Sequence, residues 1–394
     1  MRRFMTTLAI DGSTLEGGGQ LIRNSATLAV LLRKQIAVHN VRANRKPPGL
    51  KPQHVAGLNL LREISNATVT GIEKGSQTFT FHPNAVTNGE YLADPGTAGS
   101  ITLLLQVSLP CLLFAPRELN TRIADSDVNE IQPQNSVLTL CGGTNALQAP
   151  QIDYTQNVFL PFLHRHLALD GIALSIVRRG FFPHGGGRIR VQVPMRSTSL
   201  PAVNLTERGD VTSVRGIAYV AGTLPIHLAQ GMARTAERVI MDANTGTARI
   251  EIDVIQYAKD RAGAGIVLWA ETQNGCVLGG SALLDRKDRP EKVGEAAAQE
   301  LVRNLRHGGC VDEHLQDQII IFLALAKGRS NVLSGPLTLH TRTAIWVAET
   351  ITDARFETKE LEGGQVLISC EGIAYGEHPE VTLAHIEQPD VSSS

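Results

Sequence analysis

The chain has 394 residues, of which 42 % are apolar and 19 % are charged, and its formal net charge is −1. These values are typical of a globular protein large enough for two domains, and they exclude an overall positive field that attracts long nucleic acid. Aromatic residues make up only 4 %. This disfavours an extended stacking surface, so we expect any nucleic-acid contact to be local, at one strand end.

The cysteines and the apolar runs narrow the class of protein further. Five cysteines are widely spaced without a CxxC pair, so neither a disulfide framework nor a zinc site is predicted. The longest apolar stretch, 101–115, contains Gln106, Ser108 and Pro110 and is too short to span a bilayer. The basic first residues lead into no apolar run. We therefore expect a soluble, intracellular protein without a membrane partner.

The N-terminal half of the chain shows a recurring pattern of strands and helices. A first pass comprises strand 8–10, helix 20–32, strand 36–41, helix 53–64 and strands near 67–72 and 78–81. The pattern restarts at 94–100 with helix 101–114, and a third pass runs from 138–140 through helix 154–167 to strand 173–178. Repeated β-α-β-α-β-β units predict an α/β (α+β) sandwich with helices on one face of each sheet. We expect three such repeats in 1–192, the first part of a large domain.

The remainder of the chain predicts an insertion and a return to the large domain. Residues 116–136 interrupt the third pass and predict a surface loop. Residues 193–308 change in texture and predict a smaller inserted α/β domain, and the repeat-like pattern returns in 309–376 with helix 317–326. Residues 377–394 predict a frayed tail.

A glycine-rich turn follows the first predicted strand. Glu16 directly precedes three glycines, and Gln20 and Arg23 stand on the helix that follows. Glycines at a helix start let backbone N–H groups approach an anion, and the helix dipole favours negative charge there. A tight strand-to-helix turn explains the same residues equally well, so both interpretations stay open.

Two arginine-rich segments suggest phosphate recognition. Arg42, Arg45, Lys46 and Lys51 surround a Pro-Pro-Gly turn, and cations on a rigid turn suit a phosphate clamp. A solvated basic loop is the alternative for this segment alone. A second assembly of arginines and glycines at 178–190 favours a polyphosphate ligand.

His340 follows a Gly-Pro turn, and we expect it where a short strand-like run meets a helix-like stretch. An imidazole can be a base, a metal ligand or a covalent nucleophile. No tight metal-ligand spacing such as HExxH occurs, which weakens the second role. Upstream, Asp317 and Gln318 open a helix, where they either cap it or bind a ribose or a base edge.

Taken together, these segments resemble the RNA 3'-terminal phosphate cyclases, and they are most similar to the eukaryotic branch of that family. The matching segments occur in the family's order and cover nearly the whole chain. They are 16–20 with Arg23, 42–54, 96–100 with Gln106, 142–144, 179–187, 314–318 and 339–341.

The resemblance implies a fold and a reaction. The large domain would consist of repeats like the C-terminal domain of translation initiation factor 3, and the inserted domain would be thioredoxin-like. The enzyme would be an ATP-dependent ligase that converts an RNA 3'-terminal phosphate to a 2',3'-cyclic phosphate. His340 would be the catalytic nucleophile, forming a histidine–AMP intermediate that passes AMP to the RNA as RNA(3')pp(5')A.

The resemblance also assigns residues and partners. It implies a nucleotide site and phosphate contacts formed by Glu16, Arg23, Gln106, His314, Leu315, Gln316, Asp317 and Gln318, with Arg42 and Arg45 on the substrate phosphate. Glu16 would hold a metal, and the cofactors would be ATP and Mg²⁺ or Mn²⁺. The partner would be RNA with a 3'-terminal phosphate, without DNA-specific binding, and the location would be the nucleus. The sequence leaves the oligomeric state open.

One departure from the family and two alternative functions belong beside this interpretation. His314 stands where relatives usually stack a tyrosine on adenine, so nucleotide affinity is expected to differ. A cyclase-like scaffold protein of ribosomal RNA processing would share the fold but lack the histidine. An enolpyruvyl transferase would need phosphoenolpyruvate-binding motifs that the chain does not contain.

Overall fold

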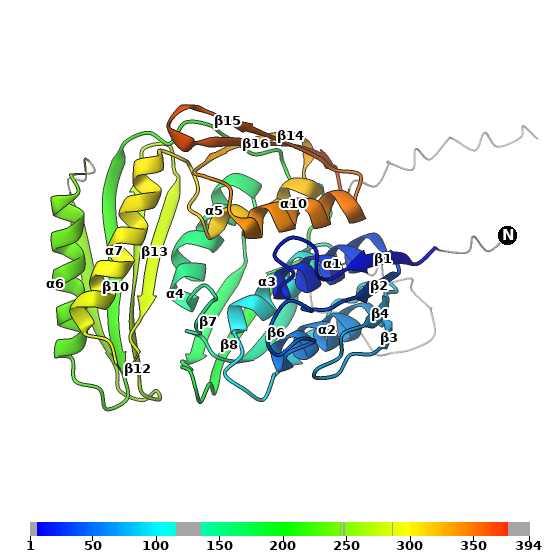
Figure 1. Ribbon diagram of the computed structural model, residues 1–394, viewed down its shortest axis with the longest axis horizontal. Helices are drawn as coiled ribbons and strands as arrows, with labels where there is room; N and C mark the ends of the chain where they lie inside the picture. Colours follow the sequence, from blue (N-terminus) through cyan, green and yellow to red (C-terminus); the bar gives the residue numbers. More distant parts are fainter. Residues whose placement is uncertain (1–5, 116–134, 245, 247–248, 286, 377–394) are drawn as a thin grey trace, which may run out of the picture.

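The computed structural model describes residues 6–115, 135–244, 246, 249–285 and 287–376 (Figure 1). Three α/β units with one shared connectivity form the large domain, and a fourth sheet with two helices forms an inserted domain. The predicted α/β class is confirmed. The predicted tail 377–394 and all but the last two residues of the predicted loop 116–136 lie outside the described residues.

The first unit shows the connectivity that the others repeat. Its elements in chain order are β1 (Leu8–Asp11), α1 (Gly19–Leu32), β2 (Ile36–His39), α2 (Pro52–Ser65), β3 (Thr68–Thr70) and β4 (Phe79–His82). The sheet order is β1-β2-β4-β3, with β1 and β2 parallel and the other neighbours antiparallel.

The second unit has the same strand order, β5-β6-β8-β7. Its elements are β5 (Glu90–Ala93), α3 (Ile101–Leu113), β6 (Asn135–Gly142), α4 (Ile152–Tyr154), a π-helical turn (Thr155–Phe159), α5 (Leu160–Leu167), β7 (Ala173–Arg178) and β8 (Gly187–Pro194). The π-helical turn joins α4 to α5, so one continuous helical segment corresponds to the predicted helix 154–167.

The third unit is split by the insertion. It begins with β9 (Asn204–Leu205) and resumes with α8 (Leu315–Gln318), α9 (Ile320–Leu325), β14 (Lys327–Ser334), α10 (Leu339–Ile351), β15 (Arg355–Glu360), a 3₁₀ turn (Glu362–Gly364) and β16 (Val366–Ile373). Its order, β9-β14-β16-β15, matches the other two sheets, with β9 and β14 parallel.

The structure therefore counts the repeats differently from the sequence pattern. The described part of 1–192 holds two units, because 138–178 completes the unit that starts at β5 instead of opening a third. The third unit forms only when β9 pairs with β14, across the insertion. A pairing over more than a hundred residues leaves no local signal in the sequence.

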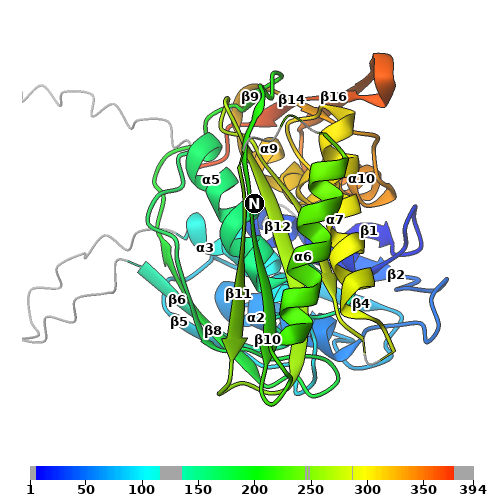
Figure 2. The ribbon, with the colours of Figure 1, turned by 90° about the vertical axis from the view of Figure 1, so that its left-hand side faces the viewer.

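The inserted domain consists of β10 (Val211–Ala221), α6 (His227–Asp242), β11 (Ile250–Tyr257), β12 (Gly263–Thr272), β13 (Val277–Leu283) and α7 (Pro290–His307). Its sheet order is β11-β10-β12-β13, with only β10 and β11 parallel. Helices α6 and α7 lie side by side on one face, seen in Figure 2. They approach closely at Gly294, where a Cβ would stand 2.2 Å from the carbonyl oxygen of Met232.

The helices of the three units face one another in the centre of the large domain, and the sheets lie outside them (Figure 1). Helix α1 is buried along most of its length because α2, α3 and α10 all pack against it. A helix surrounded in this way is apolar on nearly all sides, so the polar residues Gln20 and Arg23 in its first turns stand out. No helix of the described residues is long and apolar enough to cross a membrane.

Candidate active site

A cleft of about 630 Å³ lies where helices of the three units meet the inserted domain, a volume typical of small-molecule sites. Walls from α1, α2, α3, α8 and α10 face β13 and α7. Most of the predicted site residues line it, namely Glu16, Arg23, Arg42, Arg45, Gln106, His314, Asp317, Gln318 and His340. Segments more than 300 residues apart in the sequence are thus brought together.

His340 is the second residue of α10, so the helix-like stretch expected at this position is present. The preceding strand, β14, ends before the Gly-Pro turn, and Thr338 caps α10 by accepting a hydrogen bond from Thr341 N. A threonine N-cap fixes the helix start. The His340 side chain is 56 % exposed, and it lines the cleft at the N-terminus of α10.

Gln316 holds that helix start in place. Its side-chain oxygen accepts hydrogen bonds from Thr338 N at 3.0 Å and from the Thr341 hydroxyl at 2.5 Å. Gln316 and Leu315 are each 1 % exposed and line no part of the cleft. Their prediction as nucleotide contacts is therefore not supported, because both side chains point into the protein interior.

The imidazole of His340 has two polar neighbours on one nitrogen. Its Nδ1 lies 3.3 Å from the side-chain oxygen of Gln20 and 3.5 Å from Glu16 Oε2. The amide nitrogen of Gln20 donates in turn to Asp317. Because Asp317 accepts the amide hydrogen, the oxygen of Gln20 is oriented toward His340, so Nδ1 is the nitrogen that donates and Nε2 keeps its lone pair.

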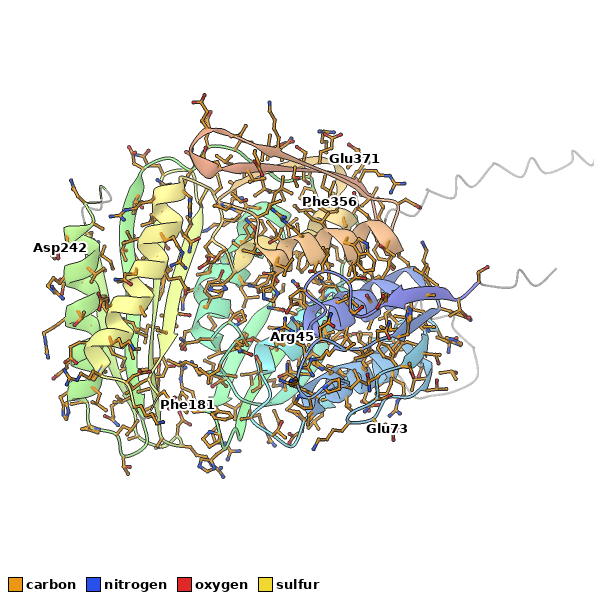
Figure 3. The ribbon with its side chains drawn as sticks, viewed as in Figure 1. Arg45, Glu73, Phe181, Asp242, Phe356 and Glu371 are labelled. Carbon is orange, nitrogen blue, oxygen red and sulfur yellow. The ribbon has the colours of Figure 1, made fainter. Side chains whose placement is uncertain are left out.

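Charged groups of both signs surround this histidine. Arg45, which is labelled in Figure 3, forms a 2.6 Å ion pair with Glu16. Burial lowers the pKa of Arg23 to about 10 despite the nearby carboxylates of Asp317 and Glu16. Burial also raises the pKa of Asp317 to about 6, against the opposing charges of His340 and Arg23. Among the described residues, Glu16 Oε2 and Arg23 Nε have no hydrogen-bond partner although both are buried, which suits groups that bind a ligand.

Arg42 lines the cleft and also supports the basic turn that follows it. It is 6 % exposed, and its guanidinium donates to the carbonyl oxygens of Pro47 and Gly49 at 3.1 and 3.0 Å. These bonds shape the turn that presents Arg45 and Lys51. Of the two interpretations of this loop, its position at the cleft favours the phosphate clamp over a solvated surface loop.

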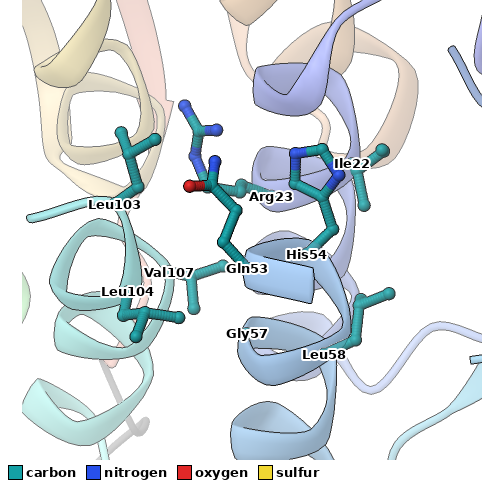
Figure 4. Close-up of a pocket in the computed structure, with 9 residues that line it drawn as sticks. All are labelled: Ile22, Arg23, Gln53, His54, Gly57, Leu58, Leu103, Leu104 and Val107. Atoms are coloured by element: carbon teal, nitrogen blue, oxygen red, sulfur yellow. The ribbon is translucent and has the colours of Figure 1, made fainter. Parts of the chain in front are cut away.

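Gln53 and His54 on α2 also line the cleft. Together with Arg23 they form the polar end of a small pocket whose other end is lined by Leu58, Leu104 and Val107 (Figure 4). Burial and three nearby cations lower the pKa of His54 to about 3, so it is neutral at physiological pH. Because His54 is neutral, the positive charge around it is carried by Arg23, Arg42 and Lys51.

The opposite end of the cleft is lined by polar side chains suited to a base or a ribose. Gln106 donates to the Gln318 side chain at 2.8 Å, and Gln318 donates to the carbonyl oxygen of His314 at 2.6 Å. His314 lies 3.0 Å from Glu300 of α7 and contacts the ring of Tyr154 edge-on at 6.1 Å. Burial alone would lower the pKa of His314, but the hydrogen bond and charge of Glu300 raise it to about 9.

Asp312, which the sequence did not single out, fixes the backbone of this end. Its fully buried carboxylate accepts hydrogen bonds from Tyr154 Oη at 2.7 Å, Gly279 N at 2.7 Å, His314 N at 2.9 Å and Leu315 N at 2.8 Å. One side chain thus joins the second unit, the inserted domain and the His314 turn. Only glycine fits at position 279, because a Cβ there would lie 2.5 Å from the Tyr154 ring.

The donors of the cleft fit a divalent cation that shares its ligands with phosphates. Glu16 offers a carboxylate oxygen without a hydrogen-bond partner, and Mg²⁺ and Mn²⁺ are commonly held by one or two carboxylates plus substrate phosphates. Glu300, Glu313 and His314 also bring ligand atoms within 4.8 Å of one another. In that cluster, Glu300 pairs with His314 and Glu313 pairs with Arg303. Glu16 also pairs with Arg45, but through Oε1, which leaves its Oε2 for a cation.

Comparisons with known proteins converge on one family. A sequence profile described as "RNA 3'-terminal phosphate cyclase" matches residues 14–358. An RNA 3'-terminal phosphate cyclase of Drosophila melanogaster is 41 % identical over 372 residues, covering 93 % of this chain and 97 % of that protein. A probable RNA 3'-terminal phosphate cyclase of Dictyostelium discoideum is 38 % identical, covering 93 % and 83 %. An RNA 3'-terminal phosphate cyclase of Pyrobaculum neutrophilum is also 38 % identical, covering 93 % and 99 %.

Proposed function

The chain belongs to the RNA 3'-terminal phosphate cyclase family of ATP-dependent ligases, and on that premise we propose that it cyclises RNA 3'-phosphates through AMP bound covalently to His340. The observation that carries this proposal is the position of His340. Its imidazole is half-exposed at a helix N-terminus, faces a cleft lined by Arg23, Arg42, Arg45 and Lys51, and has its Nδ1 held by Gln20.

The first step forms a bond between His340 and the α-phosphorus of ATP. The lone pair of Nε2 attacks phosphorus, and the bond to pyrophosphate breaks. The Nδ1 proton stays on the ring and is held by the Gln20 oxygen, which Asp317 orients. Positive charge that develops on the imidazole is stabilised by Glu16 at 3.5 Å and by Asp317. Catalysis by positioned charges of this kind is the largest contribution in many phosphoryl-transfer enzymes.

The next two steps transfer AMP and close the ring. An oxygen of the RNA 3'-phosphate attacks the phosphorus on His340, the phosphorus–nitrogen bond breaks, and RNA(3')pp(5')A forms. The 2'-hydroxyl then attacks the RNA phosphorus and expels AMP. Because the 2'-hydroxyl is a neighbour on the same ribose, its effective molarity is on the order of 10⁵ M or more. Activation by AMP is therefore the difficult part, and the covalent route divides it into two easier transfers.

The other assignments follow the cleft from one end to the other. Gln106, His314 and Gln318 would bind the adenosine end, and Arg42 and Arg45 would bind phosphate. Glu16 would hold Mg²⁺ or Mn²⁺, which supplies charge neutralisation to the phosphates. A location in the nucleus would follow the eukaryotic branch. The domain division at about 193 and 308 is supported by the separate sheet formed between Val211 and Leu283.

The test is covalent labelling of the full chain with α-labelled ATP in Mg²⁺ or Mn²⁺. We expect wild type and His227→Ala, an exposed histidine on α6, to carry label that is labile in acid and comparatively stable in base. His340→Ala should carry none, and it should not cyclise a 3'-phosphorylated oligonucleotide. Retention of label by His340→Ala would refute the nucleophile. A wild type that forms no cyclic phosphate would instead favour the scaffold protein of ribosomal RNA processing.

A further inference from the structure

The three sheets of the large domain have the same strand order, yet the charges on their strands differ. The strands of the first sheet contain no lysine or arginine. The third sheet alternates both signs, with Lys327, Arg329, Arg355 and Lys359 among Glu357, Glu360 and Glu371, and Arg329 pairs with Glu357 at 2.6 Å. The second sheet carries Arg178, Arg188 and Arg190 against Glu90 alone. We call these three arginines the arginine face.

Strand register places the arginines together on the solvent side of the second sheet. The residues between Arg188 and Gln192 alternate between exposed and buried, with Ile189 and Val191 turned toward the helices. A bulge between Ile176 and Arg178 sets Arg178 directly opposite Arg188. Arg188 and Arg190, two residues apart on one strand, are about 7 Å from each other.

This arrangement leaves positive charge without compensation. Like charges directly opposite each other on neighbouring strands are destabilising, and Arg178 and Arg188 form such a pair. Arg190 has a partner in Glu90 at 3.7 Å, although both side chains are more than half exposed. Among the described residues, none accepts a hydrogen bond or forms an ion pair with the Arg188 side chain. A polyanion bound across the face would relieve this repulsion.

The basic surface continues onto the inserted domain. Gly186, in the turn that joins β7 to β8, has the guanidinium of Arg261 beside it, 3.7 Å from where a Cβ would stand. Arg178 donates to the carbonyl oxygen of Gly186 at 2.6 Å. Asp260 is the nearby acid, and it accepts a hydrogen bond from Arg179 N. Two domains thus contribute arginines to one turn.

The same turn is connected to the cleft wall. Thr144 N donates to the carbonyl oxygen of Gly180 at 2.8 Å, and Asn145 forms a bridge with Phe181. Phe181 lies where the second unit meets the inserted domain (Figure 3). The residues that follow Asn145 line the cleft. Phe182, the next residue of the turn, is 65 % exposed, which is unusual for phenylalanine and offers a stacking surface.

We propose that the arginine face, with Phe182 at its cleft end, binds the single-stranded RNA that precedes the 3'-terminal phosphate. This inference rests on the proposed function, which places the strand end in the cleft. Guanidinium groups bind phosphates through charge-assisted hydrogen bonds, and an exposed aromatic ring stacks on any base. A flat sheet face with one ring at its edge suits an extended strand, and recognition would be independent of sequence because it reads the backbone.

The test compares RNAs of different length in the variant Arg188→Gln/Arg190→Gln. For a 20-nucleotide RNA with a 3'-phosphate, we expect KM to rise roughly tenfold, because two phosphate contacts are lost, and the salt slope of log KM to fall by about 1.4. A 3'-phosphorylated dinucleotide is too short to reach the face, so its KM should stay unchanged. Labelling of the protein by ATP should also stay unchanged.

The control is Arg355→Gln/Lys359→Gln, which removes two positive charges from β15, the strand of the third sheet that corresponds to β7. Equal losses in the control, or equal losses for short and long RNA, would overturn the proposal. Direct binding of unphosphorylated 20-nucleotide RNA, measured by fluorescence anisotropy, keeps the proposal separate from the reaction. If both double variants bind this RNA as wild type does, or if poly-glutamate binds the face more tightly, RNA is not its ligand.

Discussion

The ion pair of His314 with Glu300 places a positively charged ring at one end of the cleft. At a pKa of about 9, His314 is an imidazolium at neutral pH. A cationic ring still stacks on a base, but it also attracts phosphate and repels other cations. The charge at this position therefore depends on a pair of residues, because the hydrogen bond and charge of Glu300 raise the pKa of His314.

Glu300→Gln tests that dependence. We expect the pKa of His314 to fall from about 9 toward its ordinary value of 6.5, because the negative charge of Glu300 that raises it is removed. A folded-state pKa above the unfolded value stabilises the protein below about pH 6.5, and this contribution is lost as the pH rises through 9. The His314 side chain is 44 % exposed, so solvent screening keeps the contribution modest.

The measurement is an NMR titration of the imidazole, accompanied by urea unfolding at pH 6 and pH 9.5. In Glu300→Gln the free energy of unfolding should differ less between the two pH values than in wild type. Glu313→Gln serves as the control because Glu313 pairs with Arg303 instead. A similar fall in the His314 pKa in both variants would show that no specific pair exists.

Asp312 fixes the start of α8, and hence the positions of His314 and Asp317, by accepting hydrogen bonds from His314 N and Leu315 N. We expect Asp312→Ala to lower the free energy of unfolding by about 3 kcal/mol or more, since buried donors lose their acceptor at roughly 1–3 kcal/mol each. Asp312→Asn should lose less, because the amide oxygen still accepts from two of the donors. Urea unfolding compares the two, and ATP labelling should decline in the same order. An unchanged alanine variant would mean that water replaces the carboxylate.

Local sequence patterns predicted the bounds of several helices better than they predicted how the helices and strands assemble into units. Helical spacing predicted α1, α2 and α3 to within two residues at either end, because each has one apolar face or is apolar throughout. The residues before His340 were expected to form a strand, but they form a loop and the N-cap of α10. Thr338 is the N-cap residue. The number of repeats per segment was wrong because β9 finds its partner only in three dimensions.

The candidate site was predicted through the family resemblance more than through spacing. The family is now confirmed, and the resemblance gave the residues that converge from α1, α3, α8 and α10. It gave Gln20 no role, although Gln20 lies in a matching segment, and it did not give Glu300 or Asp312. These three residues act on other side chains. In the sequence, a glutamine or aspartate at such a position cannot be told from a residue that only caps a helix. Only the contacts in the structure distinguish the two roles.

For the whole molecule, net charge proved a poor guide to surface charge. The net charge of −1 predicted only a local contact with nucleic acid. In the structure, the positive charges are concentrated in two places. The cleft gathers Arg23, Arg42, Arg45 and Lys51 inside, and the arginine face carries three more outside. Acidic side chains on the third sheet balance its own cations. A neutral chain can therefore present a basic route from one sheet to the cleft.

That route needs the inserted domain to stay docked, and Arg179 is the side chain most suited to hold it. Its guanidinium forms a buried two-bond contact with Asp153 at 2.6 and 2.7 Å. It also donates to Tyr257 Oη at 3.0 Å and lies 4.1 Å from the centre of the Tyr257 ring. Asp153 belongs to the second unit and Tyr257 to the inserted domain. Burial alone would lower the pKa of Arg179, but the contact with Asp153 raises it.

Arg179→Ala should destabilise the protein by about 3–5 kcal/mol, because Asp153 is left buried without a counter-charge. Arg179→Met/Asp153→Leu should recover much of this stability, since similar apolar volume replaces the pair. It should not recover the contact with Tyr257, so hydrogen exchange in β11 and β12 should stay faster than in wild type.

The control is Arg165→Ala, which removes an exposed 3.8 Å pair with Glu271 across the same two domains. It should lower the free energy of unfolding by less than about 1 kcal/mol. If the double variant restores slow exchange as well as stability, apolar packing holds the domains together, and the Arg179–Tyr257 contact does not.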